Sequence, residues 1–264
     1  MLFNIGDLVT RISHNHDMVF KIIELKEDIA ILKGVNVRLI ADSDINDLLL
    51  CEEEEEEVKG DDIELMERMS DLKKLNRDEY FYMPGKILHI DADQDYLDRC
   101  IKFYKDMNIL CYGLVLHEND VANKIENYLE DINPDILVIT GHDAFYDSAN
   151  NNYQDLSNYK NSANFAKAVR RSRKYEKDQS KLIIIAGACQ SDYEELIRAG
   201  ANFASSPKRI NIHALDPAIV ASSISLSNKS KPINLLQILD KTKYGKDGIG
   251  GIITNGTMYV GYPR

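Results

Sequence analysis

The sequence predicts an α/β protein with a doubly wound, mostly parallel sheet, preceded by a small SH3-like β domain. From Lys86 onward, short apolar runs alternate with segments of helical periodicity, which is typical of parallel strands joined by crossover helices. These runs are continuously apolar, as strands covered on both faces require. The first 48 residues instead carry short β-branched runs separated by polar turns. We therefore expect a small domain at 1–48, an acidic linker and helix at 49–84, and an α/β domain at 85–264.

The predicted small domain opens with the sequence IGDLV and contains four candidate strands. They are residues 5–9, 19–23, 29–34 and 37–40. The six successive glutamates Glu52 to Glu57 then predict a solvated linker, because their like charges repel one another. A tail that attracts substrates or ions is the alternative interpretation. Apolar residues at helical spacing predict a helix over 61–79, and Pro84-Gly85 stops it.

Five strands and four helices are expected in the α/β domain. The strands are 87–90, 109–116, 135–140, 181–186 and 201–204. The helices are 94–107, a segment around 121–129, 165–175 and 192–199. A polar stretch at 144–160 is too long for a tight loop and predicts an insertion at the top of the sheet. Ligands and catalytic groups of such sheets gather at the carboxyl ends of the strands, so the residues after each strand are the candidates for function.

Composition excludes several classes of partner. The formal net charge of −11 argues against nonspecific binding to nucleic acid or to an anionic membrane. We expect no signal peptide, and no apolar run approaches the roughly 20 residues of a membrane span. The four cysteines lack a CxxC spacing and are expected to be reduced thiols rather than zinc ligands. The sequence therefore predicts protein substrates as partners and leaves the oligomeric state open.

Two predicted strands end in reactive residues. The run ILVITGHD places His142 at the edge of the sheet, and LIIIAGACQS places Cys189 at the same edge. A thiol is a nucleophile only as thiolate, and a nearby imidazole can accept its proton. A helix follows Cys189, and its positive N-terminal end favours thiolate and offers N–H groups to an oxyanion. We therefore predict a cysteine peptidase with a Cys189–His142 dyad, chemistry that requires no metal or other cofactor.

This arrangement resembles the caspase–legumain–clostripain group of cysteine peptidases. In caspases the catalytic His lies about 50 residues upstream of the Cys, and in the group one apolar strand ends in His-Gly and the next in Ala-Cys or Gly-Cys. Ala188-Cys189 fits that pattern, whereas Asp143 stands where the group has Gly after the His. That Gly N–H helps to form the oxyanion hole in the group. The resemblance therefore implies Gly141, Asp143 and Ala188 as candidate oxyanion or substrate-binding residues.

Motifs along nearly the whole chain resemble the YabG family of sporulation-associated peptidases. They are IGDLV, ILHIDAD, VITGHDAFYD, AGACQSDYEELIRAGANFASSPKRINIHALDPA and GGIITNG. The resemblance implies His142 and Cys189 as catalytic residues and spore coat and cortex-associated proteins as substrates, with cleavage after Arg. It also implies an endospore-forming bacterium, with the protein in the mother-cell cytoplasm and the forming spore coat.

Other acidic and imidazole groups leave alternatives open. Asp91 and Asp93 follow the first strand of the α/β domain and either cap the next helix or shape a substrate pocket. Further pocket candidates are Asp143, Asp147 and Asp192, and His117 is an alternative base. The alternative function is a non-catalytic, receiver-like regulatory or scaffold module in spore assembly. A receiver needs Asp where His142 stands and gives no reason for Cys189, so the likeness reflects shared architecture.

Overall fold

The computed structural model describes residues 3–51, 60–69, 81–146 and 152–261. The glutamate run at 52–57 lies outside these described residues, as does the end of the helix expected at 61–79. The start of that helix is α2 (Asp61–Glu67). Within the described ranges, no helix combines the length and the apolar character needed to cross a membrane.

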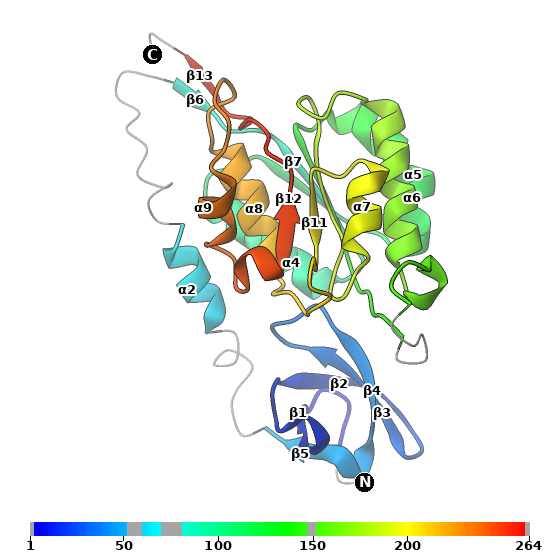
Figure 1. Cartoon of the computed structure of the whole chain (residues 1–264). Coiled ribbons are helices and arrows are strands. Elements are labelled where there is room, and N and C mark those ends of the chain that lie inside the picture. Colours follow the sequence, from blue (N-terminus) through cyan, green and yellow to red (C-terminus); the bar gives the residue numbers. More distant parts are fainter. Residues whose placement is uncertain (1–2, 52–59, 70–80, 147–151, 262–264) are drawn as a thin grey trace.

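The N-terminal strands form an antiparallel sheet of five strands in the order β4-β3-β2-β1-β5 (Figure 1). Their bounds are β1 Leu8–Arg11, β2 Phe20–Lys26, β3 Ile29–Gly34, β4 Ile40–Asp44 and β5 Leu48–Leu50. Val9 of β1, Phe20 of β2 and Leu32 of β3 belong to one apolar core. On each strand, alternate residues face the same side of the sheet. The candidate strand at 37–40 is different: only Ile40 is in a strand, and residues 35–39 form the β3–β4 loop.

The second sheet has six strands in the order β12-β11-β10-β9-β7-β8. Their bounds are β7 Ile87–Asp91, β8 Cys111–Val115, β9 Ile136–Thr140, β10 Ile183–Ala186, β11 Phe203–Ser205 and β12 Ile249–Gly251. All neighbouring pairs from β8 to β11 are parallel, and β12 pairs with β11 in the antiparallel sense. The prediction of an α/β protein with a mostly parallel sheet is therefore confirmed.

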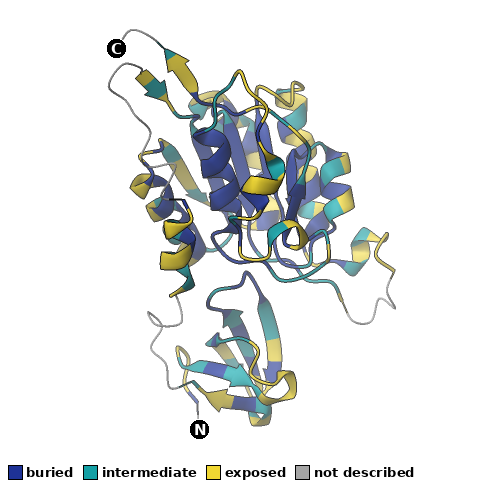
Figure 2. Ribbon diagram, turned by 60° about the vertical axis from the view of Figure 1, so that its left-hand side comes forward, coloured by how far each residue is buried: buried dark blue, intermediate teal, exposed yellow. Residues whose placement is uncertain are grey.

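Helices cover both faces of this sheet (Figures 1 and 2). One face packs against α4 (Gln94–Asp106) and α8 (Asp216–Ser225), with α9 (Leu235–Leu239) beside them. The other packs against α5 (Glu118–Ile132), α6 (Ser162–Tyr175) and α7 (Tyr193–Ala199). Strand alternation explains the two cores: Ile136 and Val138 of β9 enter the first, and Leu137 and Ile139 enter the second.

Short elements complete the chain. β6 (Phe81–Met83) and β13 (Tyr259–Gly261) form a two-stranded antiparallel sheet. Single-turn 3₁₀ helices lie at Ile12–His14, Ile45–Asp47, Leu156–Asn158 and Gly245–Asp247. None of these elements contributes a residue to the candidate site described below.

The order of the parallel strands creates a switch point between β7 and β9. The chain passes from β7 outward to β8 and then returns to place β9, β10 and β11 on the other side of β7. The loops after β7 and β9 therefore leave the sheet in opposite directions and open a crevice at its carboxyl edge. This edge faces the N-terminal sheet, which lies below it in Figure 1.

The β3–β4 loop connects the two sheets. Val37 pairs with His213 in an antiparallel bridge, and the backbone N–H of Arg38 donates to the carbonyl of Ile212 at 3.3 Å. The N–H of Ala214 donates to the carbonyl of Asn36 at 3.0 Å. A short stretch of the N-terminal part thus adds as a strand to the segment that follows β11.

Candidate functional site

Cys189 lies in a tight turn directly after β10. Gly187 has a φ of +107° and Gln190 a φ of 59°, so the backbone turns sharply on both sides of the cysteine. Glycine is required at position 187, because that φ disfavours a side chain and an added Cβ would lie 2.8 Å from a leucine of α7. Ser191 closes the turn by accepting the N–H of Ala188 at 2.9 Å. Strained turns of this kind are found at functional sites, where they present one side chain.

The thiol of Cys189 is fully buried against the N-terminal sheet. Its Sγ accepts the backbone N–H of Ile212 at 3.3 Å, and its side chain belongs to the same apolar core as Phe20 and Leu39. Burial raises the pKa of Cys189 to about 12, although the backbone N–H groups of Ile212 and Arg38 act in the opposite direction. Burial therefore favours the protonated thiol in this arrangement, and the expected effect of the following helix stays a prediction.

His142 lies at the carboxyl end of β9 with one ring nitrogen paired and the other free. Its Nε2 is 3.3 Å from Oδ2 of Asp93, and its backbone N–H donates to Oε1 of Glu118 at 2.9 Å. Nδ1 is buried and has no hydrogen-bond partner in the described structure. The ring meets Tyr96 edge to face at 5.6 Å between centroids. When the carboxylate accepts a hydrogen bond from Nε2–H, the lone pair lies on Nδ1, which is the state of a general base.

The strands that carry His142 and Cys189 are hydrogen-bonded neighbours. β9 and β10 pair in register from Ile136 and Ile183 to Ile139 and Ala186. The two reactive residues therefore follow adjacent strands at one edge of the sheet. No hydrogen bond joins their side chains in the part of the chain that the structure describes.

Asp143 ties the turn after β9 to the turn after β10. Its carboxylate accepts hydrogen bonds from the hydroxyls of Ser162 at 2.5 Å and Ser191 at 2.8 Å, and from the N–H of Asn161 at 2.7 Å. Burial raises the pKa of Asp143 to about 6, and these hydrogen bonds oppose that rise. Because Ser191 also holds the N–H of Ala188, Asp143 supports the turn that carries Cys189.

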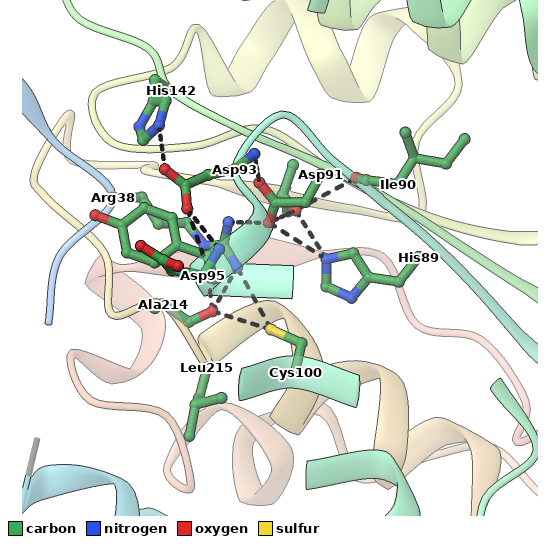
Figure 3. Close-up of polar contacts among 12 residues, drawn as sticks. Arg38, His89, Ile90, Asp91, Asp93, Asp95, Cys100, His142, Ala214 and Leu215 are labelled. Carbon is green, nitrogen blue, oxygen red and sulfur yellow. Dashed lines mark hydrogen bonds and ion pairs between the residues drawn. The ribbon is translucent and has the colours of Figure 1, made fainter. Parts of the chain in front are cut away.

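Asp93 and Asp91 have different roles at the end of β7. Asp93 is the N-cap of α4, as one of the two expectations stated, and it also pairs with His142 and Lys33. Burial opposes its ionisation, but hydrogen bonds from His142 and Lys33 hold the pKa of Asp93 at about 2. Asp91 is fully buried and forms an ion pair with the guanidinium of Arg38 (Figure 3).

Comparison with known proteins assigns the chain to a family. The model of a family described as YabG peptidase U57 matches residues 4–263. The chain belongs to the YabG peptidase U57 family. It is 42% identical over 287 residues to the sporulation-specific protease YabG of Bacillus subtilis (strain 168), over 100% of this chain and 99% of that protein. The resemblance seen in the sequence motifs is thus confirmed, and membership of the YabG peptidase U57 family supports the prediction of a peptidase.

One solved structure has a weak similarity to this chain. The apo structure of a cysteine desulfurase from Thermococcus onnurineus NA1 has a TM-score of 0.26 and 8% identity. The match covers 59% of this chain and 40% of that chain. A likeness at this level carries no argument about the fold or the function of this member of the YabG peptidase U57 family.

The three candidate oxyanion residues of this family member have different surroundings. The N–H of Ala188 is engaged by Ser191, whereas no hydrogen bond among the described residues engages the N–H of Asp143. Gly141 is needed for packing, because a Cβ there would lie 2.6 Å from Oε1 of Glu118. No hydrogen bond among the described residues engages the N–H of Gly141 either, so Gly141 and Asp143 both have a donor available, and the role of either in an oxyanion hole stays a prediction.

The remaining candidates make local structural contacts. Nδ1 of His117 accepts the N–H of Asn119 at the start of α5, and Asp192 caps α7. Asp147 lies outside the described residues. A pocket of about 350 Å³ lies beside His142; its lining is Ala92, His117, Glu118, Asn119, His142, Lys160 and Asn161. This pocket gives His142 a route to solvent that Cys189 lacks.

Sequence reasoning missed the pairing of Arg38 with Asp91. The position of Asp91 at the end of the first parallel strand was a usable signal, because ligands gather at such ends. Nothing in the sequence around Arg38 connects it with a strand end that follows 53 residues later. The pairing depends on how the two sheets contact one another.

Proposed function

We propose that this protein is a sporulation-associated cysteine endopeptidase in which Cys189 is the nucleophile and His142 the base. The substrates are spore coat and cortex-associated proteins, cut after Arg in the mother-cell cytoplasm and forming spore coat of an endospore-forming bacterium. One observation supports the assignment of the dyad most directly: Cys189 and His142 follow two hydrogen-bonded parallel strands at the same edge of the sheet. Membership of a peptidase family and the relative named a sporulation-specific protease support the process.

The chemistry follows from the atoms that the site offers. Nδ1 of His142 removes the proton of Cys189, and the thiolate attacks the scissile carbonyl carbon to form a thioester. The imidazolium then protonates the departing amine, and His142 afterwards activates the water that hydrolyses the thioester. Asp93 holds the Nε2 proton and keeps the lone pair on Nδ1. The N–H of Asp143 is our first candidate for stabilising the oxyanion, with Gly141 and Ala188 as the others.

We also propose a caspase-like arrangement of the α/β part and an SH3-like fold of the N-terminal part. We compare the placement of His142 after β9 and Cys189 after β10 with that of caspase-like peptidases, and the five-stranded N-terminal sheet with an SH3-like barrel. The strand order of the parallel sheet is shared with regulatory domains of doubly wound type, so strand order alone does not select a function. The placement of a thiol and an imidazole at adjacent strand ends favours the peptidase.

Cleavage by the Cys189→Ala variant tests the dyad. The purified chain is incubated with a spore coat extract and with a peptide containing one arginine, and the products are identified by mass spectrometry. Replacement of the nucleophile should lower turnover at least about 10³-fold, because without it no thioester can form. Cys111→Ala is the matched control and should retain activity, since Cys111 lies on the edge strand β8, away from the site.

His142→Ala should lower turnover by about 10²–10⁴-fold, the range of general acid–base catalysis. The double variant should be no slower than Cys189→Ala, because the two residues act as a unit. Activity that survives in His142→Ala would point to His117 as the base instead. Full activity of Cys189→Ala would overturn the mechanism.

A further inference from the structure

We propose that Asp91 forms the subsite for the arginine side chain of a substrate, and that the chain's own β3–β4 loop occupies this subsite with Arg38. The inference rests on the proposed peptidase function and names the residue that recognises the substrate. It also means that the described arrangement is a latent one, with the substrate groove filled from within the same chain.

The pocket around Arg38 matches a guanidinium group. Nη1 pairs with Oδ2 of Asp91, Nε and Nη2 donate to the carbonyl of Ala214 at 3.1 and 2.7 Å, and Nη2 lies 3.5 Å from Sγ of Cys100 (Figure 3). The guanidinium carbon also lies 5.1 Å from the centre of the Tyr96 ring. All of these partners belong to the α/β part, so the pocket does not depend on the small sheet.

Hydrogen bonds from Thr140 and Asp93 hold the carboxylate of Asp91 in place. The hydroxyl of Thr140 donates to Oδ2 of Asp91 at 2.7 Å, and Nε2 of His89 lies 2.8 Å from the same hydroxyl. The N–H of Asp93 donates to the other carboxylate oxygen at 3.0 Å. A carboxylate fixed in this way presents both charge and geometry to one guanidinium, and Arg binds such a group with directed hydrogen bonds.

The backbone of the loop pairs as a bound peptide would. The Arg38 N–H donates to the Ile212 carbonyl and the Ala214 N–H to the Asn36 carbonyl, which is the pattern of an added antiparallel strand. Addition of an extended peptide to a free backbone edge is a common mode of peptide recognition, in which side-chain pockets give specificity. The hydroxyl of Tyr96 also donates to the Val37 carbonyl at 2.8 Å.

The loop and the end of β3 lie beside both halves of the site. Leu39, the residue after Arg38, belongs to the same apolar core as Cys189. Lys33, near the end of β3, pairs with Asp93, the carboxylate beside His142. A substrate arginine and this loop therefore cannot occupy the groove together.

A purely structural tie is a weaker explanation of the Arg38–Asp91 pair. Burying two charges costs several kcal/mol of desolvation, and apolar residues of similar size often stabilise a contact better. The apolar contacts of Val37 and Leu39 are present on either side of Arg38. The charged pair adds specificity for a guanidinium, which a tie between two sheets does not need.

The test measures peptide binding without cleavage. Every chain carries Cys189→Ala, and the probe is a fluorescent peptide with one arginine whose anisotropy reports the Kd. Adding Arg38→Met, which keeps most of the buried volume, should tighten binding at least about ten-fold, because no guanidinium of the chain itself then competes for Asp91. Adding Asp91→Asn to that chain should weaken binding at least about ten-fold, because the charged partner of the guanidinium is lost.

Two matched controls accompany these variants. Lys26→Ala alters an exposed charge of the small sheet, whose partner is Glu24, and should leave the Kd unchanged. A peptide with citrulline in place of arginine keeps the shape but not the charge and should bind poorly to every chain. Circular dichroism verifies the fold, and Arg38→Lys is the second variant if Arg38→Met does not fold. Lysine loses the hydrogen bonds to Ala214, so it should still tighten binding at least about three-fold.

The proposal is overturned if Arg38→Met and Arg38→Lys bind the arginine peptide no more tightly than their parent. It is also overturned if Asp91→Asn leaves the Kd unchanged or if citrulline binds as well as arginine. These outcomes concern binding in a chain that lacks the nucleophile, so they do not depend on whether Cys189 is catalytic. Absence of cleavage both by the wild-type chain and by Arg38→Met, in which the loop no longer presents a guanidinium, would instead count against the proposed function and favour the regulatory module.

Discussion

The two halves of the candidate site differ in their access to solvent. His142 borders a pocket of about 350 Å³ and retains 14% exposure of its side chain, whereas Cys189 is fully buried. Both residues follow adjacent strands of one sheet, so the sheet itself does not create the difference. The difference arises because the N-terminal sheet and its β3–β4 loop lie against the Cys189 half. The α/β part therefore brings the two residues together, and the N-terminal part of the same chain covers Cys189.

Of the variants that test this difference, Asp91→Ala should change the stability of the protein most. Asp91→Ala leaves the buried guanidinium of Arg38 without its charged partner, and the free energy of unfolding should fall by up to about 3–5 kcal/mol. Urea denaturation followed by circular dichroism measures the change. The double variant Arg38→Met, Asp91→Asn should recover most of the loss, because neither charge remains.

Asp95→Ala is the matched control for that loss. Asp95 pairs with Lys33 but its side chain is 71% exposed, so its removal should cost less than about 1 kcal/mol. Equal losses for Asp91→Ala and Asp95→Ala would mean that the buried pair does not hold the two sheets together.

Thiol labelling measures how well the Cys189 half is closed. In the wild-type chain at neutral pH, iodoacetamide should modify Cys51 and Cys111 well before Cys189, because burial raises the pKa of Cys189 to about 12 and only thiolate reacts. Arg38→Met should raise the rate at Cys189 at least about ten-fold by loosening the loop, with Cys100 remaining slow. Peptide mass spectrometry resolves the four sites. Rapid labelling of Cys189 in the wild-type chain would show that the loop does not cover it.

The pH dependence of stability tests the contribution of Asp143, which supports the Cys189 half. Its pKa is about 6 in the fold and about 3.9 in an unfolded chain, so the fold disfavours its ionised form. The contribution of this group is complete below about pH 3.9 and is lost as the pH rises through about 6. Wild type should therefore lose stability relative to Asp143→Asn between pH 4.5 and 7. The difference between the two chains cancels the titration of His89 and His213; a constant difference would contradict the assignment.

Much of the fold could be predicted because its determinants are local in sequence. Continuous apolar runs predicted β7 to β11, and helical periodicity predicted α4 to α7, with ends that agree within a few residues. Gly200 ends α7 in the left-handed conformation, which a glycine directly after a helix adopts readily. The structure of the segment 37–40 was harder to predict, because its β-branched and apolar residues favour a strand, whereas its pairing partner lies in the α/β part of the chain.

The α/β architecture, the placement of His142 and Cys189 after neighbouring strands, and the family could all be predicted from the residues alone. These features depend on strand composition, on motifs and on the rule that parallel strands end at one edge. Folding in three dimensions was needed to show that Asp93 pairs with His142, that Asp143 supports the turn carrying Cys189, and that Arg38 pairs with Asp91. Each of these contacts joins residues far apart in the chain, and a side chain buried by a distant segment acquires its pKa from that segment. Local pattern contains no such information.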